Sequence, residues 1–161
     1  MKEAQRATTL LELLTVISVL AITLALGIPT LQDMLHANRA RTLHDQLRAS
    51  LQAARVHSIE QRQEVEICGS GNGITCRNDW RRGWLVREKN SGQVLHSTRL
   101  SSAAPLIWKG LSKRIRYHPD GHSHASNGTF TYCGAKPGQG WSITLNRQGR
   151  VRSTHAITCT P

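Results

Sequence analysis

Aromatic and acidic residues are both scarce in this chain. Of its 161 residues, 4 are Trp, 2 are Tyr and 1 is Phe, and 10 Asp and Glu stand against 21 Lys and Arg, a net charge of +11. This length allows one ordinary domain with an anchor, and so few aromatic side chains predict a modest core. We find no carboxylate pair and no nucleophile beside a base, which argues against an enzyme. The positive charge favours a polyanionic partner, whether nucleic acid, anionic lipid or an acidic protein.

Acids are rarest in the second half of the sequence. Residues 89–161 contain 10 Lys and Arg but a single acid, Asp120, whereas residues 1–88 contain 11 Lys and Arg and 9 Asp and Glu. The second half therefore carries most of the net charge and would attract phosphate before any contact forms. A highly charged surface that only keeps the protein soluble is the alternative.

One long apolar run lies near the N-terminus. Residues 10–28 read LLELLTVISVLAITLALGI, nineteen residues with Glu12 as the only charge, about the length of a membrane-spanning helix. Lys2 and Arg6 precede it and predict a cytoplasmic N-terminus, with the rest of the chain outside. The run continues past Pro29 into helical sequence, unlike a removable secretory signal. Because a carboxylate is costly in an apolar helix, we expect Glu12 to have a partner.

The stretch ATTLLELLTVISVLAI resembles the type IV prepilin signature, in which a basic leader is followed by a small residue, a Glu and a long apolar helix. The resemblance implies that prepilin peptidase cleaves after Ala7 and that Thr8 becomes the N-methylated first residue. It also implies that Glu12 faces the terminal amine of a neighbouring subunit. The family usually has Gly and Phe where Ala7 and Thr8 stand, and Thr at the new terminus is more typical of minor pilins. A plain single-pass anchor is the alternative.

The rest of the chain changes from a helical to an alternating pattern. Apolar residues recur at helical spacing up to about Arg62, which predicts one amphipathic helix. These residues are Leu31, Leu35, Leu43, Leu47, Leu51 and Ala54. After Gln63, short alternating runs separated by Gly, Asn, Ser or Pro predict successive antiparallel strands. We therefore expect an α+β fold in four segments: a leader at 1–7, a transmembrane or fibre-core half-helix at 8–29, an amphipathic half-helix at 30–62 and a β-rich head with a basic tail at 63–161.

The four cysteines do not have the spacing of a zinc site. No CxxC pair is present, so a zinc ribbon is excluded, and disulfides suit a domain outside the cytoplasm. Four cysteines permit three pairings, of which we favour Cys68 with Cys76 and Cys133 with Cys159. The Gly-rich segment GSGNG between the first two is not followed by GK[ST], so it does not predict a phosphate loop.

A second and more specific resemblance runs nearly end to end. The segments AARVHSIEQRQEVEIC, DWRRGWLV, IRYHPDGH, FTYC and GRVR resemble the minor pilin and pseudopilin family typified by GspH and FimT. The resemblance implies a type IV pilin-like fold, in which a long N-terminal helix packs on an antiparallel β-sheet head. It also implies a single-pass protein of the inner membrane with a periplasmic head, which later joins other major and minor pilins in an extracellular pilus.

The last segment predicts a basic turn. The sequence WSITLNRQGRVRSTHAITC reads as a strand, a turn over residues 146–149 and a returning strand. Because side chains alternate along a strand, Arg150 and Arg152 should project from one face, with Arg147 beside them in the turn. Guanidinium groups offer a planar fork of donors that suits phosphate oxygens. In FimT-like proteins the resemblance implies that Gly149, Arg150 and Arg152 form a Gly-Arg-x-Arg motif that binds DNA captured during natural transformation.

Other polar clusters have two interpretations each. Lys136 and the cluster of Lys113, Arg114 and Arg116 extend the DNA surface or are solvated charges. The three imidazoles of HPDGHSH, His118, His122 and His124, hold a metal or face solvent, and we favour solvent and expect no metal or other cofactor. Trp80, Trp84 and Trp141 lie in strand-like runs, so we expect them in the core rather than stacked on single-stranded DNA.

The sequence therefore predicts a FimT-like minor pilin that binds DNA without base readout. Two rival interpretations remain. One is a GspH-like pseudopilin of a type II secretion system, and the other is a minor pilin that primes pilus assembly without binding DNA. An enzyme on a membrane anchor would need a catalytic set that we do not find.

Overall fold

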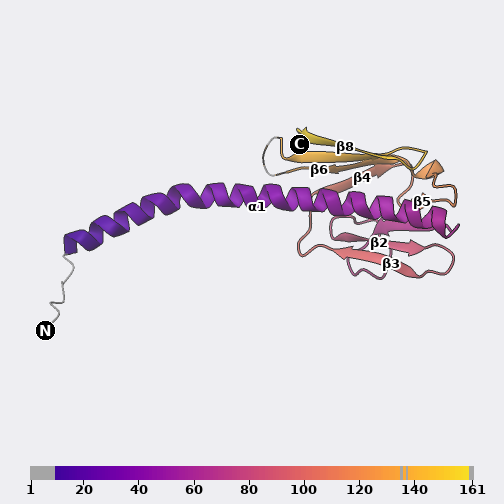
Figure 1. Ribbon diagram of the computed structural model, residues 1–161, viewed down its shortest axis with the longest axis horizontal. Helices are drawn as coiled ribbons and strands as arrows, with labels where there is room; N and C mark the ends of the chain where they lie inside the picture. Colours follow the sequence, from indigo (N-terminus) through magenta and orange to yellow (C-terminus); the bar gives the residue numbers. More distant parts are fainter. Residues whose placement is uncertain (1–9, 135, 137, 160–161) are drawn as a thin grey trace. The chain divides into compact units, whose positions relative to one another are not determined.

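The computed structural model describes residues 10–134, 136 and 138–159 (Figure 1). The chain divides into two compact units, Met1–Ala37 and Asn38–Pro161, and we call the second unit the head. The expected cleavage and methylation positions, Ala7 and Thr8, lie outside the described residues.

One helix, α1 (Leu10–Glu60), contributes to both units and includes Pro29. In the first unit its large apolar side chains and Glu12 are exposed, and by length and composition this part of the helix could cross a membrane. Buried positions begin at Ala40, and Leu31 and Leu35, which share the helical spacing, are exposed. The spacing marks the apolar face of the helix, and the part of that face buried in the head begins at Ala40.

The strands of the described chain form two antiparallel four-stranded sheets. The first sheet has the order β3 (Val94–Arg99), β2 (Gly83–Glu88), β1 (Val65–Gly69), β5 (Ile115–Tyr117). The second has the order β4 (Leu106–Gly110), β6 (Gly128–Tyr132), β7 (Gly140–Leu145), β8 (Val151–Ile157). A 3-10 helix, η1 (His124–Ser126), lies between β5 and β6. The expected α+β class and the antiparallel strands are confirmed.

Two tryptophans attach the head half of α1, residues 38–60, to both sheets. The Trp84 indole of β2 donates to the Ser50 hydroxyl over 3.0 Å, and the Trp141 indole of β7 donates to the Ala40 carbonyl over 2.9 Å. Both rings are buried, as is Trp80, so their expected place in the core is confirmed. A buried tryptophan stabilises the fold most when its indole N–H has a hydrogen-bond acceptor, and each of these two has one.

Replacing Ser50 with alanine is expected to lower the free energy of unfolding by about 2 kcal/mol, because the buried Trp84 N–H would lose its acceptor. Chemical denaturation of the full chain measures this cost. Ser102→Ala, at an exposed position, is the control and should change stability by less than about 0.5 kcal/mol. Equal costs at the two positions would contradict the role given to Ser50.

Both disulfides join the pairs that we favoured. Cys68 bonds Cys76 across eight residues, and Cys133 bonds Cys159 across 26 residues. The first bond closes a short loop after β1. The second ties the segment after β8 to the segment after β6, so the last strand is covalently fixed at its far end.

Candidate nucleic-acid interface

The basic turn, which we define as residues 146–150, joins β7 to β8. Asn146 organises it, because its backbone carbonyl accepts from the Gly149 N–H at 3.0 Å and its side-chain oxygen accepts from the Arg150 N–H at 2.8 Å. The Asn146 N–H in turn donates to the Arg150 carbonyl at 3.1 Å. Gly149 has a φ of +74°, a left-handed conformation that suits glycine. An Asx-type turn with glycine near its end is the local reason for this conformation.

The basic turn is seated on the loop between β5 and η1. Ser123 donates its N–H to the Arg147 carbonyl at 2.9 Å and its hydroxyl to the Asn146 carbonyl at 2.8 Å. A Cβ placed on Gly149 would lie 2.1 Å from the Gly121 carbonyl oxygen, so the two backbones are in direct contact. This packing fixes where the turn lies on the head.

The arginines of this region are exposed. Arg147, Arg150 and Arg152 all face solvent, while Val151 between them is half-buried against the core. The expected alternation across the start of β8 is therefore present. Within residues 10–134, 136 and 138–159, the ion pairs involve none of these three guanidinium groups. Their donors are available to an external anion.

Arg55 is a residue of this site that sequence reasoning missed. It lies on α1, and its Nε donates to the Gly121 carbonyl at 3.0 Å, the same oxygen that Gly149 approaches. The side chain also lies close to Tyr117, a buried residue under the turn. Burial raises the pKa of the Tyr117 hydroxyl, and the positive charge of Arg55 opposes that rise. No local pattern could reveal Arg55, because it reaches the turn from 94 positions earlier in the chain.

Asp120, the one acid after Glu88, lies in the loop under the turn and interacts with histidines. Its carboxylate accepts from the His122 N–H at 2.9 Å and lies 3.3 Å from His122 Nδ1 and 3.7 Å from His124 Nε2. The hydrogen bond from the His122 backbone holds the pKa of Asp120 below its ordinary value. The acid is therefore ionised at neutral pH. Its interactions are with His122 and His124 of its own loop and not with the arginines of the turn.

The three histidines of this loop are partly exposed, with side-chain exposures of 35% for His118, 44% for His122 and 60% for His124. His118 Nδ1 lies 2.9 Å from a Glu64 oxygen. Across the described ranges, no group of three or more His, Cys, Asp or Glu has an arrangement that could hold a metal ion.

The predicted extensions of the DNA surface lie elsewhere. Lys113, Arg114 and Arg116 belong to β5 and the segment before it, in the first sheet, whereas the turn belongs to the second. Lys136 precedes β7, at the opposite end of that strand from the turn. Tyr117 of β5 nevertheless lies next to Gly149, so β5 and the basic turn are neighbours although they belong to different sheets.

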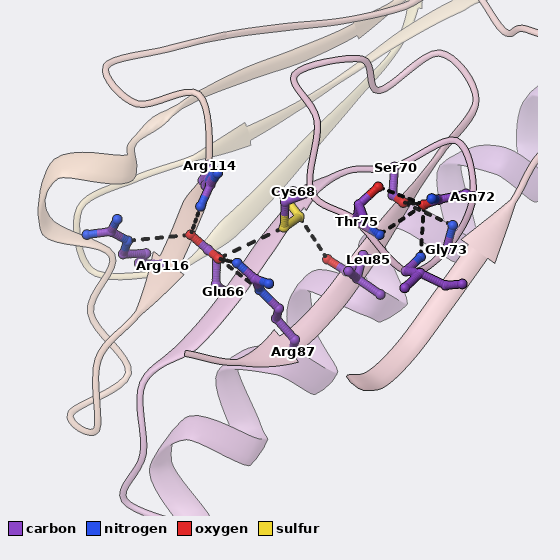
Figure 2. Close-up of a disulfide and its surroundings, with 12 residues drawn as sticks. Glu66, Cys68, Ser70, Asn72, Gly73, Thr75, Leu85, Arg87, Arg114 and Arg116 are labelled. Carbon is purple, nitrogen blue, oxygen red and sulfur yellow. Dashed lines mark hydrogen bonds and ion pairs between the residues drawn. A yellow bond between two sulfur atoms is a disulfide. The ribbon is translucent and has the colours of Figure 1, made fainter. Parts of the chain in front are cut away.

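Arg114 and Arg116 also have an internal partner, the buried carboxylate of Glu66 (Figure 2). Arg114 Nη1 and Arg116 Nε lie 3.2 Å and 3.8 Å from Glu66 Oε1, and Arg87 Nη2 lies 2.7 Å from Oε2. That this cluster extends the DNA surface stays a prediction. Glu66 neutralises part of its charge, and Lys113 alone of the three is without such a bond among the described residues.

Comparison with known proteins identifies the family. The family model described as type II transport protein GspH matches residues 44–149, so it includes most of the head and ends at Gly149, one residue before Arg150. Among curated proteins, none matches this chain.

Two crystal structures of the type IV minor pilin FimU from Pseudomonas aeruginosa strain PAO1 have a similar fold. The P21 crystal form is 23% identical, with a TM-score of 0.59, over 74% of this chain and 90% of FimU. The P65 form is 22% identical, with a TM-score of 0.53, over 72% of this chain and 93% of FimU. The match to two thirds of the sequence and the shared architecture lead to one conclusion: this chain belongs to the GspH family and has the fold of a type IV pilin.

Proposed function

We propose that this protein is a minor pilin of a type IV pilus that binds extracellular DNA without sequence preference, for uptake in natural transformation. The observation that carries the proposal is the basic turn. It presents Arg147 and Arg150 to solvent on a seat fixed by Ser123 and Gly121, with Arg152 beside it at the start of β8. None of the three has an ion-pair partner in the described part of the chain. Preorganised guanidinium groups bind phosphate oxygens with little loss of side-chain freedom.

The proposed binding mode is contact with the phosphate backbone. Three guanidinium contacts give a slope of log K against log salt of about −3 on duplex DNA, with modest affinity and no base readout. Trp80, Trp84 and Trp141 take no part, because all three are buried. Arg55, beside Gly121, adds positive charge under the turn.

The proposed path to the pilus begins in the inner membrane. The apolar part of α1 serves first as a single-pass anchor with the head in the periplasm and later as the contact with major and minor pilins. Prepilin peptidase removes residues 1–7, Thr8 becomes the methylated terminus, and Glu12 pairs with the amine of a neighbouring subunit. The segment boundaries 8–29, 30–62 and 63–161 belong to the same proposal.

A second candidate function is a pseudopilin of a type II secretion system. The family model favours it, because its description is that of a type II transport protein and its match stops before Arg150. A minor pilin that primes assembly is a variant of this candidate. In both cases the basic turn would contact protein partners, and DNA binding would not depend on it.

A salt titration of a labelled duplex tests the proposal. The full chain in a zwitterionic detergent is compared with Arg150→Gln, Arg152→Gln, and we expect affinity to fall about tenfold or more and the slope to change from about −3 to about −1. Arg39→Gln, Arg41→Gln removes the same charge from two exposed positions on α1 and should retain most of the affinity. If both double variants lose affinity equally, general charge and not the turn binds DNA. In cells, transformation should fall while piliation persists, and the reverse result would favour the assembly role.

A further inference from the structure

The loop closed by the first disulfide, residues 68–76, has a fixed shape without a helix or strand beyond Gly69 (Figure 2). The Asn72 side-chain oxygen accepts from the N–H groups of Ile74 at 3.0 Å and Thr75 at 2.9 Å. It also accepts from the hydroxyls of Thr75 and Ser70. The Ser70 hydroxyl accepts from the Gly73 N–H at 3.0 Å. We call residues 68–76 the disulfide loop.

The disulfide loop presents an apolar side chain to solvent. Ile74 is 70% exposed, and the hydrogen bonds of Asn72 hold it in this position. Large aliphatic side chains at loop tips normally gain free energy by finding an apolar environment. A rigid loop loses little conformational freedom when its tip enters such an environment.

Two arginines, Arg82 and Arg99, lie against the disulfide loop. The aliphatic part of Arg82 lies 3.5 Å from a Cβ built on Gly71, and Arg99 Nε lies 3.2 Å from one built on Gly73. Arg77 leaves the loop directly after Cys76, and Arg81 precedes Arg82. These four side chains are exposed, and no ion pair involves them within the described ranges. The acid of this segment, Asp79, accepts the Arg81 backbone N–H at 3.0 Å, and the net charge stays strongly positive.

An apolar tip with arginines nearby has the chemistry of a membrane-surface contact. The aliphatic group enters the headgroup and acyl boundary, and the guanidinium groups bind lipid phosphates. Nucleic acid would use the arginines but would leave Ile74 in water, and an acidic protein partner would have to supply an apolar pocket at the same place. A bilayer supplies both at once, and this chain carries a helix that could cross one.

The disulfide loop lies at one end of the first sheet. The disulfide loop follows the Gly69 end of β1, and Arg99 beside it shares a groove of about 530 Å³ with Gln46 on α1. By contrast, the other end of the first sheet lies beside His57, whose Nε2 is 3.1 Å from Glu88. The loop thus lies near Gln46 of α1, at the other end of the first sheet from His57.

We propose that the disulfide loop is a membrane-contact surface, in which Ile74 inserts at an anionic bilayer while Arg82 and Arg99 bind phospholipid phosphates. This inference rests on the proposed membrane anchor and is independent of DNA binding. It gives the head a defined contact with the bilayer before the subunit leaves the membrane.

Fluorescence quenching by brominated lipid tests this contact. The full chain carrying Ile74→Trp is reconstituted in nanodiscs of phosphatidylcholine, with or without phosphatidylglycerol, and compared with Leu111→Trp, since Leu111 is also 70% exposed. We expect the emission of the tryptophan introduced in the loop to be quenched at least about twofold more than that of the control in anionic discs. Arg82→Gln, Arg99→Gln should remove most of this difference, whereas Arg150→Gln, Arg152→Gln should not.

Four outcomes would overturn the proposal. Equal quenching at the two positions would mean that the loop does not reach the bilayer. Quenching that is the same with and without phosphatidylglycerol would mean that the arginines bind no lipid phosphate. If Arg82→Gln, Arg99→Gln leaves quenching intact but weakens duplex binding, the surface belongs to DNA. If the chain does not enter nanodiscs, it lacks the membrane anchor, and this result would contradict the proposed function as well.

Discussion

Replacing Glu66 with glutamine is expected to lower the free energy of unfolding at neutral pH by about 3–5 kcal/mol. Glu66 is 2% exposed, on the face of β1 that lies under Arg87, Arg114 and Arg116 (Figure 2). Glutamine keeps the shape but removes the charge, so three guanidinium groups would face one another without a counter-ion. The disulfide loop lies beside this cluster, with Cys76 Sγ 3.9 Å from Glu66 Oε2.

The same variant should change how stability depends on pH. Burial alone would raise the pKa of Glu66, but the hydrogen bonds from Arg87 and Arg114 outweigh it and hold that pKa below its ordinary value. A carboxyl group with a lowered pKa in the folded state stabilises the protein above its unfolded pKa, and this contribution is lost as pH falls through the folded pKa. The stability difference between wild type and Glu66→Gln should therefore shrink below about pH 4.

Urea denaturation of the full chain at several pH values measures both effects. Glu60→Gln is the matched control, because Glu60 is exposed at the end of α1, and it should change stability by less than about 0.5 kcal/mol. Glu64 and Glu88 also have lowered pKa values, through hydrogen bonds from Lys89 and from Ser91, so some acid sensitivity remains in every variant. A Glu66→Gln cost as small as the control, or one that does not vary with pH, would contradict the role of the buried carboxylate.

Replacing Gly149 with alanine is expected to cost about 3 kcal/mol of stability and to weaken DNA binding. Two causes add: the left-handed backbone at φ +74° disfavours a side chain, and the new Cβ would lie 2.1 Å from the Gly121 carbonyl oxygen. The oxygen is backbone and is held by Arg55, so it cannot turn away. Relief requires the basic turn to leave its seat, and Arg147 and Arg150 move with it.

Gly92→Ala separates the two causes. Gly92 has a φ of +71°, but a Cβ there would meet nothing within 4 Å, so only the backbone strain of about 1 kcal/mol applies. Thermal unfolding and duplex titration of both variants give the comparison. We expect a larger loss of stability for Gly149→Ala and unchanged duplex binding for Gly92→Ala. If the two variants behave alike, the contact between the turn and Gly121 does not position the arginines.

Local sequence patterns predicted the helix and strands of this fold well, because the hydrophobic period and the turn residues depend only on residues close together in the chain. The helix, the alternating runs and the basic turn between β7 and β8 all lie where expected. These patterns could not predict that the strands pair into two separate sheets, because register and sheet membership depend on contacts between distant segments.

The site was predicted only where its residues are close in sequence. Gly149, Arg150 and Arg152 could be recognised together, but Arg55 comes from α1 and the seat from Gly121 and Ser123. For Arg114 and Arg116 the sequence did not reveal the ion-pair partner Glu66, because a run of positive charge has no local sign of a partner 48 or 50 positions earlier. Glu66 alternates with Val65 and Ile67, and only the paired strands reveal that its side chain lies under the arginines.

The bond between Cys133 and Cys159 has a mechanical consequence. A ligand held at the turn pulls on one end of β8, an edge strand whose ladder partner is β7. Under load such a strand would peel from its neighbour one hydrogen bond at a time. The disulfide stops that peeling at the far end, because Cys159 stays bonded to the segment after β6. Tension applied through Arg150 or Arg152 therefore reaches the segment after β6 through the disulfide as well as through the ladder between β7 and β8.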